Sequence, residues 1–159
     1  MPTTEHSDSA YIEATPEAVY ALVADITRMG EYSPVCTACW WDDEAAAKRS
    51  GAVAVGDWFT GRNDLPDRTW ETRSQVVAAE PGREFAFAVG GTNVRWGYRF
   101  DAEGSGTRVT ESWQVPPAGV AWFAERFGDD ADAQLEVRYE LARTGIPVTL
   151  AAIKAAAEA

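Results

Sequence analysis

Histidine is almost absent from this 159-residue chain, in which His6 is the only one. Catalytic sites of the Ser-His-Asp or Cys-His kind need a histidine inside the fold, and His6 lies close to the N-terminus. The chain also lacks a phosphate-binding loop and the GxGxxG dinucleotide motif. These absences argue against both classes of hydrolase and against a nucleotide cofactor, and nothing in the sequence indicates any other cofactor.

Basic residues are scarce, since 14 Lys and Arg stand against 25 Asp and Glu, for a net charge of −11. Nucleic acids and anionic membranes attract proteins through Lys and Arg, so we expect no nucleic-acid partner and no stable membrane insertion. No apolar run approaches the roughly 20 residues of a membrane span. Residues 1–9 lack the apolar core of a signal peptide. We expect a soluble cytoplasmic protein, either a monomer or a homodimer.

Cys36 and Cys39 are the only cysteines and form one isolated CxxC. Zinc would need two further ligands, so no metal site is expected. A redox-active CxxC usually begins a helix, whereas this one precedes Trp40 and Trp41 in a run that predicts a strand. We interpret both cysteines as structural and reduced. The sequence leaves open whether they ever form a disulfide.

An amphipathic pattern dominates the C-terminal end and predicts one long helix over residues 131–158. Asp129 and Asp130 are suitable N-cap residues, and the pattern continues through Pro147, where we expect a bend. One stripe holds Leu135, Tyr139, Ala142, Ile146, Thr149, Leu150 and Ile153, and Val137, Leu141 and Val148 widen it to more than half the circumference. So wide an apolar arc predicts a helix gripped by a concave surface.

Short alternating segments upstream predict the sheet that grips this helix. We expect a disordered tail at residues 1–8 and a single domain over 9–159, with no second domain. The predicted order is a strand at 9–14, a helix from Thr15-Pro16 to near Met29-Gly30, strands at 35–41, 56–63, 68–79, 85–89, 94–100 and 109–115, and a short helix at 118–127. Short connections imply antiparallel neighbours, and one apolar face per strand implies a sheet covered on one side.

Glu111 is the most unusual acidic residue, because its strand neighbours at alternate positions, Val109 and Trp113, are apolar. Its carboxyl is either buried at a cavity wall or brought to the surface by a local twist, unless an arginine pairs with it. Burial without a partner would raise its pKa, which suits a general acid or base.

Two arginines are candidates for the same cavity. Arg138 falls inside the apolar arc of the long helix, where it either meets Glu111 or an anionic ligand group, or extends to the surface with its guanidinium in water. Arg62 shares a strand face with Trp58 and Thr60, which places it either at the cavity mouth or on a surface edge.

Aromatic residues are abundant, with seven tryptophans, and most fall on the predicted inner faces. Each of them can fill a core, but together they exceed what a small core needs, and small-molecule pockets are commonly built this way. The predicted ligand-binding set is Trp58, Arg62, Trp70, Trp96, Tyr98, Glu111, Trp113, Arg138 and Tyr139. Glu111 and Arg138 are also the candidates for catalysis.

Several short segments together resemble the START-like (SRPBCC) superfamily, in its bacterial polyketide cyclase/dehydrase-like branch. They are TPEAVY (15–20), DITRM (25–29), YSP (32–34), GDWFTGRN (56–63), GTRVTE (106–111) and TLAAIK (149–154), and the resemblance extends from about Tyr11 to Glu158. It implies an α+β helix-grip fold, in which a seven-stranded antiparallel sheet wraps around the C-terminal helix with a deep apolar cavity between them. This superfamily includes carriers, aromatase/cyclases and co-chaperone-like proteins, so fold alone does not settle function.

The sequence therefore supports three hypotheses of function. The first is a carrier or sensor that binds an aromatic or lipid-like molecule, with residues 42–56 and the Trp122/Phe123/Phe127 segment at the entrance. The second is a polyketide cyclase/aromatase-type enzyme that uses Glu111 and Arg138. The third is a protein-interaction module without a ligand, which would have a filled core and an exposed apolar patch.

Overall fold

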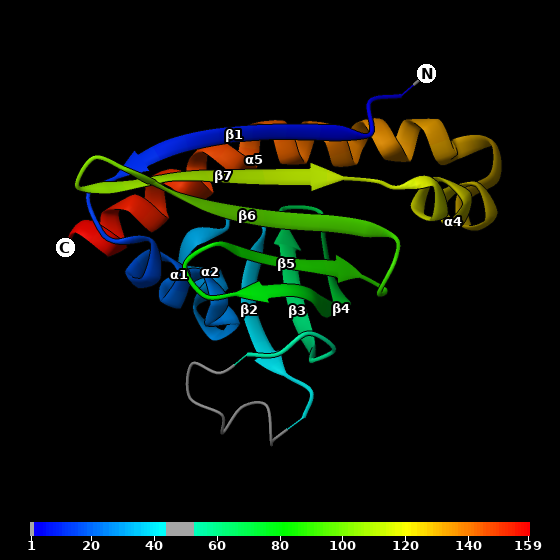
Figure 1. Ribbon diagram of the computed structural model, residues 1–159. Helices are drawn as coiled ribbons and strands as arrows, with labels where there is room; N and C mark the ends of the chain where they lie inside the picture. Colours follow the sequence, from blue (N-terminus) through cyan, green and yellow to red (C-terminus); the bar gives the residue numbers. More distant parts are fainter. Residues whose placement is uncertain (1, 44–52) are drawn as a thin grey trace.

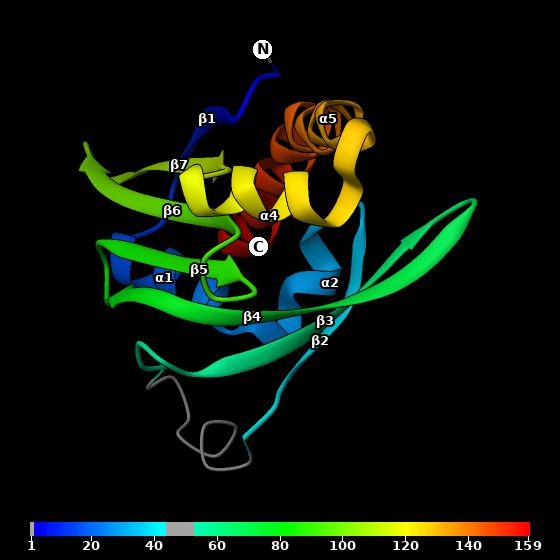
Figure 2. The same ribbon diagram turned by 90° about the vertical axis from the view of Figure 1, so that its right-hand side faces the viewer.

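The computed structural model describes residues 2–43 and 53–159. Its sheet has seven strands in the order β1-β7-β6-β5-β4-β3-β2, and every neighbouring pair is antiparallel. The strands are β1 (Glu5–Ile12), β2 (Cys36–Trp41), β3 (Trp58–Leu65), β4 (Arg68–Glu80), β5 (Glu84–Val89), β6 (Val94–Glu103) and β7 (Gly106–Gln114). The predicted helix-grip arrangement is confirmed, because the sheet curves around α5 (Ala131–Glu158) (Figures 1 and 2).

The chain enters the concave side of the sheet through α1 (Pro16–Ala24), whose start follows from its sequence. Pro16 occupies the first helical position, and the Thr15 hydroxyl accepts a hydrogen bond from the Ala18 N–H at 3.2 Å, as expected of an N-cap. This helix is shorter than predicted. It stops at Ala24, where the Asp25 carboxylate caps a following 3₁₀ turn (Ile26–Arg28) by accepting from the Thr27 N–H.

A second, short helix, α2 (Met29–Tyr32), then packs against the start of β2. The contact is close because Gly30 has no side chain, and a Cβ built there would lie 2.3 Å from the Thr37 carbonyl oxygen. Gly30 therefore belongs to α2 and is not the helix stop that the sequence predicted. This position fixes where the β2 backbone runs under the helices.

The predicted apolar stripe of α5 is confirmed. The fully buried residues on it are Leu135, Ala142, Ile146, Thr149, Leu150 and Ile153, and Tyr139 is half-buried. The helix continues through Pro147, and Asp130 occupies the N-cap position without a side-chain cap bond. Val137 and Val148 are 48% and 51% exposed, so the prediction that they belong to the gripped arc is wrong. The buried arc is narrower because these two valines lie on the side of the helix that faces solvent.

The prediction of a disordered tail at residues 1–8 is wrong from Glu5 onward, because β1 begins there. The Cα of Glu5 pairs with that of Gln114, and His6 with Trp113. Beyond the strand, the Val115 N–H donates to the Thr4 carbonyl at 2.7 Å. Strand pairing uses backbone groups that every residue except proline carries in full, so a polar segment beside the free edge of β7 joins the sheet without an apolar pattern of its own.

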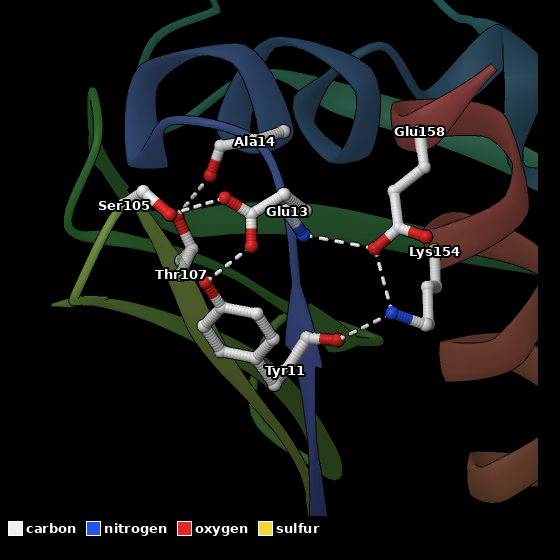
Figure 3. Close-up of polar contacts among 7 residues, drawn as sticks. All are labelled: Tyr11, Glu13, Ala14, Ser105, Thr107, Lys154 and Glu158. Carbon is white, nitrogen blue, oxygen red and sulfur yellow. Dashed lines mark hydrogen bonds and ion pairs between the residues drawn. The ribbon is translucent and has the colours of Figure 1, made fainter.

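Polar contacts tie the end of α5 to the end of β1 (Figure 3). The Glu158 carboxylate accepts the Glu13 N–H at 2.8 Å, and the Lys154 ammonium donates to the Tyr11 carbonyl at 3.0 Å and to Glu158 at 2.6 Å. The Glu13 side chain in turn accepts from the hydroxyls of Tyr11 and Ser105. The helix is thus held to β1 and, through Ser105, to the β6–β7 turn.

Helix α4 (Pro117–Phe127) confirms the predicted short helix at 118–127 and carries the Trp122/Phe123/Phe127 segment. Phe123 is buried, and the three rings contact one another with centroids 5.2–6.0 Å apart. Of the predicted entrance loop at 42–56, residues 44–52 lie outside the described residues. Among residues 2–43 and 53–159, no helix is long and apolar enough to cross a membrane.

Candidate functional site

A buried carboxyl lies on the inner face of the sheet, where β6 and β7 pair. Tyr98 on β6 and Glu111 on β7 are direct cross-strand partners on the inner face, and each is 2% exposed. The Tyr98 hydroxyl donates a hydrogen bond to Oε2 of Glu111 at 2.9 Å. Within the part of the chain that the structure describes, the other oxygen, Oε1, is buried and has no hydrogen-bond partner.

Burial raises the pKa of Glu111 to about 8, and the hydrogen bond from Tyr98 offsets only part of that effect. Burial, and next the charge of Glu111, raise the pKa of Tyr98 well above 10. Both groups are therefore neutral in their main form at pH 7. Of the two interpretations of Glu111, the buried one is confirmed, since no twist exposes it and no arginine of the described residues pairs with it.

In the neutral state, the two oxygens of the Glu111 carboxyl have different hydrogen-bonding roles. Because Oε2 accepts from Tyr98, the carboxyl proton is best placed on Oε1, the oxygen without a partner. A protonated carboxyl carries one donor, so Oε1–H is a hydrogen-bond donor in an apolar interior. An unpartnered buried polar group costs about 1–3 kcal/mol, and an oxygen from a bound molecule would remove that cost.

Aromatic rings line the same face beside this pair. Trp96 and Trp113 form the next cross-strand pair on this face, two residues from Tyr98 and Glu111. Trp113 is buried and Trp96 is half-buried. The Trp113 ring lies 6.3 Å from that of Tyr139 on α5, and the His6 ring meets Tyr139 edge-on at 5.9 Å. Four of the predicted ligand-binding residues are thus brought together with Glu111 as a group: Trp96, Tyr98, Trp113 and Tyr139.

The predicted inner face of β3 is wrong. Phe59 packs into the core, with its ring centroid 5.1 Å from that of Phe87, so the alternating set of Trp58, Thr60 and Arg62 faces away from α5. Arg62 pairs with Asp64 at 3.5 Å on the exposed side, and the guanidinium of Arg73 covers the Trp58 ring at 4.7 Å. The sequence misled because Trp58 and Phe59 are adjacent aromatic residues, so either of them could have been the one that faces the core.

The inner face of β3 instead holds residues that the prediction missed, and they lie beside the predicted face of β4. Gly61 and Asn63 alternate with Phe59, and the Asn63 amide donates to the Thr72 hydroxyl at 3.4 Å. Trp70 and Thr72 belong to the alternating set of β4 that continues into buried Ser74. Phe59 does alternate with Gly61 and Asn63 in the sequence. Neither glycine nor asparagine is apolar, however, so this set did not form an apolar face that the sequence could indicate.

Arg138 and Glu111 are not brought into contact. The Arg138 guanidinium donates to the Gln134 side chain at 3.0 Å and lies 5.8 Å from the Phe123 ring centroid. Burial, and next the charge of Arg68, lower the pKa of Arg138. Arg68 in turn covers the Trp70 ring at 4.1 Å. These contacts place Arg138 and Trp70 near the β3–β4 turn and α4.

An apolar surface strip lies on the opposite side of α5. Val137 and Leu141, with Thr144, line a shallow hollow of about 390 Å³ whose rim carries Glu136 and Glu140. This is the kind of exposed patch that the interaction-module hypothesis requires. It faces away from the Glu111 carboxyl, so it does not belong to the site between sheet and helix.

The arrangement matches a known family. The family model for polyketide cyclase/dehydrase and lipid transport matches residues 3–141. The chain belongs to this polyketide cyclase/dehydrase family. A polyketide-cyclase-like protein of Corynebacterium glutamicum is 47% identical, with 97% of this chain and 91% of that chain covered and a TM-score of 0.66.

More distant structures share the fold of this family member. The di-domain ARO/CYC protein StfQ from the steffimycin biosynthetic pathway is 15% identical, with 98% of this chain and 50% of that chain covered and a TM-score of 0.67. A protein of Thermus thermophilus is 14% identical, with 95% of this chain and 94% of that chain covered and a TM-score of 0.68. No curated protein matches the chain. Membership of the family supports a role in binding or cyclising a hydrophobic molecule.

Proposed function

We propose that this polyketide cyclase/dehydrase family member is a carrier or sensor that binds an aromatic or lipid-like small molecule between the sheet and α5. One observation carries the proposal, namely the unpartnered Oε1 of Glu111 on an apolar inner face with aromatic rings beside it. A few convergent polar groups in an apolar surround are typical of small-molecule sites. The Trp113 and Tyr139 rings supply the apolar contact, and Oε1–H supplies the polar one.

The polar contact selects a class of ligand. A neutral carboxyl that already accepts from Tyr98 has a proton to donate, so it favours a ligand with a carbonyl or ether oxygen. A ligand carboxylate is disfavoured at Glu111, because it would bring a second negative charge within reach of a group that ionises near pH 8. The expected ligand is therefore an apolar ketone, ester or quinone-like molecule.

Two probes of similar size test this selection. Benzophenone and diphenylmethane differ only in a carbonyl, and binding is measured by quenching of tryptophan fluorescence and by native mass spectrometry. We expect benzophenone to bind about tenfold more tightly, equivalent to about 1.4 kcal/mol for one hydrogen bond. The preference should disappear in Glu111→Met and persist in Glu71→Met, which changes an exposed glutamate on the same sheet.

Two outcomes contradict the proposal. If neither probe binds and the purified protein carries no apolar passenger, the interaction-module hypothesis gains weight. If both probes bind and the Glu111→Met protein keeps the preference, the ligand contacts another donor. Irradiation of bound benzophenone provides an independent map, since cross-links on Trp113 or Tyr139 support the assigned position.

A cyclase or aromatase activity is the second candidate, and the raised pKa of Glu111 favours it. A carboxyl with a pKa of about 8 is a proton donor at neutral pH and a base above it, in a site from which water is largely excluded. The shared fold with StfQ, an ARO/CYC protein, adds support. Since Arg138 contacts Gln134 and Phe123, the candidate proton-transfer pair is Glu111 and Tyr98.

Deuterium exchange at the central carbon of dibenzoylmethane, a 1,3-diketone, tests this second candidate. The enzyme hypothesis expects protein-dependent exchange that rises with pH through about 8 and is lost in Glu111→Gln. Binding of dibenzoylmethane without faster exchange at any pH would leave the carrier or sensor function.

A further inference from the structure

The two cysteines lie together on the inner face of β2, although three positions separate them. In a regular strand, residues i and i+3 point to opposite faces. Here the β2–β3 register shifts between Cys36 and Ala38, because Cys36 pairs with Asn63 and Ala38 with Arg62. This bulge adds one residue to β2 and turns both thiols to one side. Their sulfurs are 3.2 Å apart.

The backbone around the thiols maintains this arrangement. Gly61 on β3 is the partner of Cys39, and a Cβ built on Gly61 would lie 3.3 Å from the Cys39 sulfur and 3.6 Å from that of Cys36. The missing side chain therefore leaves the space that the two sulfurs occupy. Helix α2 packs against the bulge through Gly30, and the Thr37 hydroxyl donates to the Asp64 carboxylate.

The thiols belong to the same interior as the carboxyl. A negative charge on either thiol would, after burial and Glu111, raise the pKa of Tyr98 further, so both sulfurs lie within electrostatic reach of that hydroxyl. This coupling links β2 to β6 across the concave side of the sheet. Cys39 is buried and Cys36 half-buried, so Cys36 is the thiol that a small molecule reaches first.

We propose that Cys36 and Cys39 form an oxidation site in the wall of this interior, where a small aliphatic disulfide converts the two thiols into an intramolecular disulfide. A sulfur–sulfur bond is about 2.05 Å long, so the sulfurs need only a short approach from their present separation. The modification makes the wall of the interior responsive to the thiol–disulfide balance around the protein. This oxidation does not depend on which ligand the interior binds.

The two thiols have different roles in the exchange. The hydrogen bond from the Cys39 thiol lowers the pKa of Cys36, whereas that bond and burial raise the pKa of Cys39. The Cys36 thiolate attacks one sulfur of the small disulfide, whose other half leaves as a thiolate and takes up a proton. The Cys39 thiol then loses its proton to water and attacks the Cys36 sulfur, which releases the second half as a thiol. Two protein thiols are oxidised, and one small disulfide is reduced to two thiols.

Exchange with bis(2-hydroxyethyl) disulfide and 2-mercaptoethanol in defined ratios tests the proposal. Free thiols are alkylated with iodoacetamide and counted by intact mass. We expect the native chain to close to the disulfide, with an equilibrium constant at least about tenfold above that of the same chain in urea, because the fold holds the sulfurs together. Closure no more favourable than in urea would overturn the proposal.

Single substitutions test the order of attack. Cys39→Ser should accumulate a mixed disulfide on Cys36, because the second thiol is missing. Cys36→Ser should react at least about tenfold more slowly, since the remaining thiol is buried and has a raised pKa. Equal rates for the two variants would overturn the assignment of Cys36 as the attacking thiol. Circular dichroism checks that both variants keep the fold.

Discussion

Tyr98 and Glu111 occupy directly opposed positions on β6 and β7, so a tyrosine hydroxyl and a carboxyl meet at 2.9 Å without either side chain leaving the inner face of the sheet. In a sheet, directly opposed residues on one face have their Cβ atoms only about 5 Å apart. The contact therefore follows from the strand register. It fixes which carboxyl oxygen is occupied and which is left for a ligand.

The stability of the protein should depend on pH through Glu111. Its pKa is about 8 in the folded chain against an ordinary 4.5, so the folded state binds the proton more tightly. The resulting stabilisation is complete below about pH 4.5 and is lost as pH rises through about 8. Each pKa unit is worth about 1.4 kcal/mol, so the loss is on the order of a few kcal/mol.

Urea unfolding at pH 5 and pH 8.5 measures this loss as a difference in the free energy of unfolding. Glu111→Gln cannot ionise and should show a much smaller difference than the native sequence. Glu71→Gln, on the exposed side, should behave like the native sequence. Parallel pH curves for all three proteins would mean that Glu111 is already ionised in the folded state.

Tyr98→Phe should raise the pKa of Glu111 further, because the hydrogen bond from the tyrosine hydroxyl lowers that pKa. The substitution also leaves Oε2 without its donor, which costs about 1–3 kcal/mol in the free energy of unfolding. Carbon-13 NMR of the labelled Glu111 carboxyl gives the pKa, and urea unfolding gives the stability.

Tyr11→Phe is the matched control, since Tyr11 donates to Glu13 at 2.6 Å in an exposed position. Water replaces that bond, so the loss of stability should be clearly smaller than for Tyr98→Phe. Similar losses would argue that the Tyr98 contact is also accessible to water.

The two sides of α5 should respond differently to truncation. Ile146 is 1% exposed and Val148 is 51% exposed, although both lie in the apolar part of the helix. Ile146→Ala should cost about 2–5 kcal/mol through lost burial and a cavity. Val148→Ala should change stability by less than about 0.5 kcal/mol. A large cost for Val148→Ala, measured by urea unfolding at several protein concentrations, would instead indicate that another chain covers this face.

The contact between Glu158 and the Glu13 N–H should protect that amide from exchange with solvent. Glu158→Gln removes the charge and weakens both the Glu13 and the Lys154 contacts. We expect the Glu13 amide to exchange faster, while amides at the centre of β7 keep their rates. Hydrogen exchange followed by NMR distinguishes this local opening from global unfolding, in which all amides would speed up together.

The sequence predicted the parts of the fold that repeat a pattern over many residues. The stripe from Leu135 to Ile153 spans five turns of helix and the one-sided strands alternate clearly, so the grip of sheet on helix was predictable. It was less informative where a single residue decides the geometry. The bulge at Thr37 turns one of the two thiols to the other face of the strand, and no local sequence pattern predicts this bulge.

The sequence also predicted the positions of some candidate-site residues correctly and those of others not. Trp96, Tyr98, Glu111 and Trp113 lie on two long, regular strands, and all four are on the predicted inner face. For Arg62, the surface edge and not the cavity mouth is the correct alternative, since Phe59 rather than Trp58 is directed into the core. The partners of Arg138 depend on how α4 and the β3–β4 turn meet α5, which is a tertiary contact that periodicity in one segment does not encode.

The strand order has a consequence for how the chain assembles. Strands β2 to β7 each pair with a neighbour in sequence, through short connections, except that the link from β2 to β3 is longer. Strand β1 leaves the ribosome first, yet among the described strands it pairs only with β7, which begins at Gly106. Contacts so distant in sequence form late, because the closing of a long loop must be compensated first. We therefore expect the first strand to be synthesised to be the last to join the sheet, after β7 has been made.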